Sequence, residues 1–277
     1  MRTILRGTLA LAAAAALATP AIAQNAQTQN GDTFDWSGTI PAGSWLTVRN
    51  LNGAVDVEAA SGDQASVHGT KEYHGDADAS RVHFVVMKDG SNVTICALWN
   101  EGDSCDEDGY HSHSDRGHTD HVSVHFTVKL PKGVRMNAGT VNGDVSVAGA
   151  TAPVKAHTVN GSVEASTTAG PVDASTVNGD VRVRMDALTG DGDLRYSTVN
   201  GSITAELPNG LNADIDMETV NGSLTSDFPL TVSGSINPRH HLHATIGSGG
   251  RRIEFHTVNG SIELRTARMR RGPSPKD

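Results

Sequence analysis

Short runs of alternating apolar and polar residues recur along the chain and predict β-strands. Four of them directly follow an Asn-Gly pair, at residues 144–147, 162–165, 180–183 and 202–205. A weaker copy of the alternation lies half-way between them, at 153–156 and 171–174. We therefore predict a repeating unit that carries two short strands, each followed by a turn. Its inward positions would be Val145, Val147, Val154, Ala156, Val163, Ala165, Val172, Ala174, Val181 and Val183.

The tetrapeptide Thr-Val-Asn-Gly marks this unit six times. Successive copies are separated by 18, 18, 22, 21 and 38 residues, and the last step is about two periods. Recurrence at a fixed period is typical of one structural unit stacked on itself. The copies begin at Thr140, Thr158, Thr176, Thr198, Thr219 and Thr257.

Two all-β architectures are compatible with this pattern. Asn-Gly favours a type I′ turn and thus an antiparallel hairpin meander. A parallel β-solenoid, similar to a single-stranded β-helix, would instead stack each Thr-Val-Asn-Gly turn on the next. We favour the solenoid because it explains the identity of all four residues, with glycine supplying a positive φ and asparagine forming an amide ladder. The predicted ladder residues are Asn142, Asn160, Asn178, Asn200, Asn221 and Asn259.

The region before residue 140 is less regular. Residues 45–57 contain Asn50-Leu51-Asn52-Gly53 and predict a degenerate first repeat. Further strands are predicted at 82–87, 93–97 and 122–130, and the polar insertion at 100–120 reads as a long loop.

These motifs resemble the DUF4097 family of β-strand-repeat proteins, whose members are often labelled adhesins. The resemblance covers roughly residues 33–264 and implies a right-handed β-helix or a close relative, with no catalytic residues to transfer. This chain departs from the family pattern in its His- and acid-rich insertion. The similarity is carried by Leu46-Thr47-Val48-Arg49-Asn50-Leu51-Asn52-Gly53-Ala54-Val55-Asp56-Val57, the serial Thr-Val-Asn-Gly, Gly247-Ser248-Gly249-Gly250 and His256-Thr257-Val258-Asn259-Gly260-Ser261-Ile262.

The two ends of the chain differ from the repeat domain at 33–264. Residues 1–23 read as a signal peptide, with a basic start, an apolar stretch and an Ala-Ile-Ala cleavage site, and residues 24–32 as a flexible N-terminus. Residues 265–277 read as a basic, disordered tail, or as a tether to phosphorylated glycolipid. The formal net charge of −9 argues against nucleic acid as a partner. We expect no integral membrane segment after signal cleavage.

Two cysteines and a histidine cluster are the candidate sites. In an exported protein, Cys96 and Cys105 are expected to form a disulfide. A His-rich loop is either a solvated loop or a weak zinc or copper site, and we expect no other cofactor. The candidate metal ligands are His111, His113, His118 and His121.

Acidic residues raise two further hypotheses. Asp144 and Asp180 occupy the slot after Asn-Gly in alternate repeats, where Ser stands in the others. They are candidates for a polysaccharide-active site, but both residue types are common in turns, and we favour that role. Asp106, Asp108 and Gly109 echo a calcium loop that lacks the flanking helices and the final Glu, so we predict no calcium hand there.

Nothing in the chain has the pattern of a catalytic triad, and we expect a protein that is not an enzyme. The predicted function is binding, adhesion or scaffolding at the cell envelope, in the periplasm or on the surface of a Gram-negative bacterium. The partner would be an envelope protein or glycan. The alternatives are an envelope-stress-linked regulatory protein and a carbohydrate-active β-helix enzyme.

Overall fold

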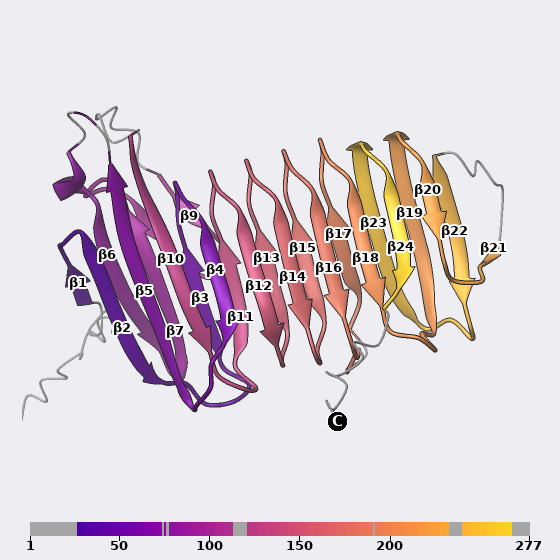
Figure 1. Ribbon diagram of the computed structural model, residues 1–277, viewed down its shortest axis with the longest axis horizontal. Coiled ribbons are helices and arrows are strands. Elements are labelled where there is room, and N and C mark those ends of the chain that lie inside the picture. The colour runs from indigo at the N-terminus through magenta and orange to yellow at the C-terminus, as the bar shows by residue number, and fades with distance from the viewer. Residues whose placement is uncertain are drawn as a thin grey trace, which may run out of the picture.

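The protein is a stack of β-strand rungs in two facing sheets (Figure 1). The structure, a computed structural model, describes residues 27–73, 75, 78–112, 121–190, 192–232 and 240–267. The predicted signal peptide and most of the basic tail lie outside the described residues. Sheet A has 12 strands and sheet B has 10.

Seven rungs form the stack, and each rung contributes one strand to sheet A and one to sheet B. In sheet A they are, in spatial order, β3 (Trp45–Arg49), β11 (Arg135–Gly139), β13 (Val154–His157), β15 (Val172–Ser175), β17 (Leu194–Ser197), β23 (Arg251–Asn259) and β19 (Ala213–Asn221). In sheet B they are β4 (Val55–Ala59), β12 (Val145–Ala150), β14 (Val163–Thr167), β16 (Val181–Met185), β18 (Ile203–Leu207), β24 (Ile262–Thr266) and β20 (Leu224–Ser226).

Antiparallel strands close both ends of the stack, and at the first end they follow one further strand in each sheet that still pairs in parallel with the rungs. At the first end, sheet A continues into β7 (Asn92–Leu98), β6 (His83–Asp89) and β1 (Gln27–Gln29), and sheet B into β10 (Val122–Leu130), β5 (Gln64–Tyr73) and β2 (Thr33–Thr39). At the other end, sheet A adds β22 (His241–Ile246) and β21 (Thr231–Val232). The remaining elements are a short 3₁₀ helix, η1 (Ala79–Arg81), and a small hairpin of β8 (Ser104–Cys105) and β9 (Tyr110–His111).

All neighbouring rungs pair in parallel, so the solenoid prediction is confirmed and the antiparallel meander is wrong for the rungs. The degenerate first repeat is a true rung, since β3 and β4 pair in register with β11 and β12. The ten residues predicted to face inward are all buried. Their small side chains set a thin core between the sheets, and Phe34, Phe84 and Phe126 pack against one another in the core of the first end.

The last rung does not follow the chain order. Strands β23 and β24 lie between the rung of β17 and β18 and the rung of β19 and β20, and they appear in yellow inside the stack in Figure 1. The step of 38 residues between the last two copies of the tetrapeptide is therefore not a stretched repeat. The chain moves one rung ahead, forms β22, and returns to fill the position that it left open.

The Thr-Val-Asn-Gly turns form one continuous edge of the stack, which we call the turn edge. Along the order Asn52, Asn142, Asn160, Asn178, Asn200, Asn259 and Asn221, each Asn Nδ2 after the first donates to the Oδ1 of the preceding Asn at 2.7–2.9 Å. Each threonine hydroxyl donates to the glycine carbonyl of the neighbouring rung at 2.8–2.9 Å. The valines point outward, and Val159, Val177, Val199 and Val220 are 38–54% exposed.

Glycine is required at the turn edge mainly by close packing. A Cβ added at Gly179 would lie 2.0 Å from the carbonyl oxygen of Gly161, and one at Gly201 only 1.8 Å from that of Gly179. Gly179 also has the predicted positive φ, at 152°. Gly201 is not among the positive-φ glycines, so the expectation that φ alone selects glycine is incomplete. What requires glycine at both positions is the direct contact between the backbones of stacked rungs.

Candidate functional site

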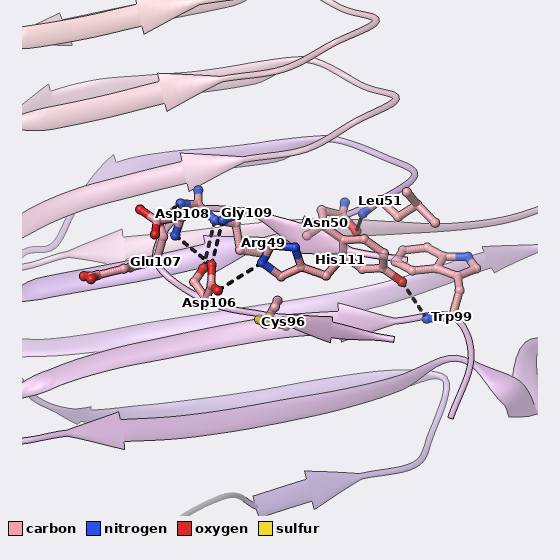
Figure 2. Close-up of a disulfide and its surroundings, with 12 residues drawn as sticks. Arg49, Asn50, Leu51, Cys96, Trp99, Asp106, Glu107, Asp108, Gly109 and His111 are labelled. Carbon is pink, nitrogen blue, oxygen red and sulfur yellow. Dashed lines mark hydrogen bonds and ion pairs between the residues drawn. A yellow bond between two sulfur atoms is a disulfide. The ribbon is translucent and has the colours of Figure 1, made fainter. Parts of the chain in front are cut away.

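A buried arginine on the outer face of sheet A organises the most unusual polar cluster. Arg49 ends β3 and is 2% exposed, although alternation along the strand turns its side chain outward, opposite to Leu46 and Val48. It is covered by the hairpin of β8 and β9 (Figure 2), which we call the acidic hairpin because Asp106, Glu107 and Asp108 form its tip. The predicted long loop at 100–120 thus contains ordered structure in its first part.

The guanidinium of Arg49 is held by neutral acceptors. Nε donates to the Asp106 carbonyl at 3.3 Å, and Nη2 donates to the Glu107 carbonyl. Nη1 donates to Asn137 Oδ1 at 3.1 Å and lies 2.9 Å from His157 Nε2. Burial lowers the pKa of Arg49 to about 10, against the attraction of the three tip carboxylates, so the group keeps its charge at neutral pH.

His157 is neutral at pH 7, mainly because it is buried. Its Nε2 accepts from an arginine, which places its proton on Nδ1. Burial, with Arg49 and Lys155 as lesser causes, lowers the pKa of His157 to about 4. The position of Gly139 between the two side chains makes room for them, since a Cβ there would lie 2.5 Å from His157 Nε2.

A disulfide and a tyrosine tie the acidic hairpin to the sheet. Cys105 on β8 is bonded to Cys96 on β7, the disulfide expected from the sequence (Figure 2). The Tyr110 hydroxyl donates to Asp103 and accepts from the Trp99 backbone N–H at 3.1 Å. Burial raises the pKa of Tyr110, so it stays a donor. These contacts fix the hairpin over Arg49.

The candidate metal ligands are only partly described. His111 Nε2 lies 3.0 Å from Asp106 Oδ2, and His121 precedes β10, while His113 and His118 lie outside the described residues. Within the ranges that the structure describes, no group of three or more His, Cys, Asp or Glu is placed to hold a metal ion. Asp106 Oδ1 accepts from the N–H groups of Asp108 and Gly109, which is an Asx turn rather than a calcium loop.

The two repeated carboxylates serve the turns. Asp144 Oδ1 accepts from the backbone N–H of Ser162 at 2.7 Å, and Asp180 Oδ1 accepts from that of Ser202 at 2.9 Å. Asp180 also pairs with Arg182 at 2.7 Å. The slot therefore joins each rung to the next, which supports turn chemistry over catalysis.

An open depression lies on sheet B, at the edge opposite the turns. Its volume is about 470 Å³, and its charged lining residues are Glu58, Arg184 and Asp186. Both acids are engaged, Glu58 with Lys129 and Asp186 with Arg184 at 3.1 Å. Each carboxylate that lines the depression is therefore paired with a cation.

Sequence reasoning missed Arg49, Asn137 and His157. Arg49 belongs to the family motif, but alternation along β3 predicts that its side chain faces solvent. Its burial depends on a hairpin that begins 55 residues later, at Ser104. The sequence does place an acidic segment next to a cysteine, which indicates a loop tethered to the fold. It does not indicate which strand that loop covers.

The fold defines a class, a two-sheet parallel β-solenoid with a repeated turn edge and antiparallel caps. The family model described as Toastrack DUF4097 matches residues 39–265, and the chain belongs to this family. A comparison with curated proteins found no match. Within the described residues, no helix is long and apolar enough to cross a membrane.

Two solved structures are similar to this chain. One is a "putative cell adhesion protein" from Clostridium sporogenes, with 9% identity, a TM-score of 0.43, and coverage of 85% of this chain and 100% of the other. The second is a "putative adhesin" from Bacteroides fragilis, with 11% identity, a TM-score of 0.31, and coverage of 85% and 97%.

Proposed function

We propose that this protein is an exported, non-catalytic binding or scaffold protein of the cell envelope, in the periplasm or on the surface of a Gram-negative bacterium. The observation that carries the proposal is the use of the repeated polar groups. In the rungs, the Asn, Thr and Asp side chains that recur at fixed positions are bonded to the neighbouring rung. They hold a long surface in place, and their hydrogen bonds to the next rung serve the stack.

The geometry supports binding over hydrolysis. General acid–base catalysis needs a carboxyl group whose surroundings shift its pKa toward the working pH. Asp144 and Asp180 lie two rungs apart, and each is committed to a backbone N–H of the next rung. The Cys96–Cys105 disulfide supports an oxidising compartment, since such bonds persist outside the cytosol. No feature of the described residues favours a regulatory role in particular.

Co-sedimentation with insoluble envelope material tests the proposal. Purified protein is mixed with cell-wall sacculi and with outer-membrane fragments, and the pellet and the soluble sugars released are both measured. We expect the protein in the pellet and no released sugar. Release of sugar that is abolished by Asp144→Asn or Asp180→Asn would overturn the non-catalytic function. Absence from every pellet would overturn binding.

A further inference from the structure

One region of sheet A carries cations without carboxylate partners. Trp45 on β3, Arg135 on β11 and Lys155 on β13 lie on the outer face, and we call these three residues the cationic patch. The Arg135 guanidinium lies 5.7 Å from the centroid of the Trp45 ring, and Lys155 Nζ lies 5.3 Å from it. Trp45 and Arg135 are half-buried, and Lys155 is exposed.

The cations of the patch differ from most rung arginines further along the stack; within the described chain Arg251 is the exception, since it donates to the backbone carbonyls of Gly190 and Gly192. Among the described residues, Arg135 and Lys155 form no ion pair, whereas five rung arginines each have a carboxylate within 4.0 Å. Those five are Arg182, Arg184, Arg195, Arg252 and Arg265. In a chain with net charge −9, these two cations therefore form a small positive surface beside Trp45.

Carboxylates border the patch without neutralising it. On one side the acidic hairpin presents Glu107 and Asp108, whose charges act on neighbouring Arg49. On the other side Asp173 is the register partner of Lys155 but forms no ion pair with it within the described chain. Burial raises the pKa of Asp173, against the opposing attraction of Lys155 and Arg195, so this carboxylate weakens the positive potential of the patch without forming an ion pair with Lys155.

The patch is flat and has no open strand edge. Strand β3 pairs with β7 and β11, β11 with β3 and β13, and β13 with β11 and β15. A peptide could not add to these strands through main-chain hydrogen bonds, which is the usual way in which sheets bind extended peptides. A ligand of this surface must be recognised by side chains alone.

We infer that the cationic patch binds a carboxylate-bearing polysaccharide. Arg135 on the adjacent strand β11 and Lys155 on β13, one strand further, both lie over the Trp45 ring and can donate to one carboxylate, while the exposed part of the half-buried indole ring contacts the apolar C–H groups of the sugar. A linear acidic glycan carries its charges at regular intervals along an extended chain, which suits a flat sheet face. This inference rests on the proposed binding function and specifies its ligand class and its location.

Binding of polygalacturonate to the full chain, with neutral dextran as the matched polymer, tests the inference. We expect Arg135→Ala/Lys155→Ala to weaken polygalacturonate binding about ten-fold or more, because two charge-assisted contacts are lost. The control variant Lys129→Ala/Arg182→Ala removes the same charge from the outer face of sheet B and should change binding little. If the alanine variant melts early, Arg135→Gln/Lys155→Gln replaces it.

A second variant should act in the opposite direction. Glu107→Gln/Asp108→Asn removes repulsion at the border of the patch and should tighten binding about three-fold at low salt. Glu164→Gln/Glu263→Gln, on sheet B, is its control and should leave binding unchanged.

The outcomes separate this inference from the proposed function. Equal binding of dextran and polygalacturonate, or equal loss in the patch and control variants, would overturn the patch while binding itself stands. Equal affinity for poly-glutamate would overturn the assignment to a glycan. If neither polymer binds but the protein sediments with envelope material, the inference fails and the proposed function is retained.

Discussion

The turn edge and the acidic hairpin both hold polar side chains in hydrogen-bonded networks, and they do so in opposite ways. At the turn edge each Asn bonds to the same atom of an identical residue one rung away. Under the hairpin, Arg49 donates to two backbone carbonyls, to the amide oxygen of Asn137 and to the imidazole nitrogen of His157. Repetition distributes the stabilisation over many equivalent contacts, whereas the hairpin concentrates it on one guanidinium.

The largest expected effect is the loss of stability when a glycine is replaced by alanine, which should be large in the turn edge and small in the acidic hairpin. Gly179→Ala should destabilise the protein by more than about 4 kcal/mol, because its Cβ would lie 2.0 Å from the Gly161 carbonyl oxygen. Gly109→Ala in the acidic hairpin is the matched control, since nothing lies within 4 Å of its added Cβ. Chemical denaturation measures both. Equal losses for the two variants would contradict the close-packing explanation.

The next effect concerns pH. The pKa of His157 is lowered from its ordinary 6.5 to about 4, so between these values the unfolded chain binds a proton that the folded protein does not. Stability from this group is complete above pH 6.5 and is lost as the pH falls to 4, by roughly 3 kcal/mol. His157→Asn should flatten the profile over that window relative to wild type, and exposed His68→Asn should not. Parallel profiles for wild type and His157→Asn would refute this assignment.

The disulfide tests how far the hairpin depends on its tether. Cys96→Ser/Cys105→Ser should lower the free energy of unfolding by about 2–3 kcal/mol, since the bond closes a short loop. A dithiol reductant should produce the same loss in the wild type and none in the double variant. The turn edge should be unaffected, which hydrogen exchange of the Asn178 amide can show. A loss of protection there would mean that the two regions are coupled.

The smallest effect compares positions within the turn edge itself. Asn178→Ala breaks two ladder bonds and should cost about 1–2 kcal/mol, whereas Asn221→Ala, at the end of the ladder, breaks one and should cost about half as much. Thermal melting of both variants checks the ratio. Equal costs would show that the loss of stability does not follow the number of ladder hydrogen bonds that are broken.

The repeated region could be predicted from the sequence because the alternation of apolar and polar residues there agrees with the way the rungs pack. Val145 and Val163 alternate with polar residues, and the stack buries them as predicted. The position of Asn259 between Asn200 and Asn221 was not readable, since every rung offers the same surfaces to either neighbour and the repeat does not encode its order. The cluster at Arg49 was missed because its partners come from separate segments with no periodic relation.

The returning last rung has a consequence for how the protein folds. Most solenoids can grow outward one unit at a time, because each repeat contacts only its neighbours in the chain. Here β24 pairs with β18 and β20, so the rung of β19 and β20 has no place against the stack until residues 251–266 arrive. Until then β17 and β18 present open strand edges of the kind that recruit other chains. Completion of the far end is thus one concerted, long-range step, and we expect it to limit the folding rate.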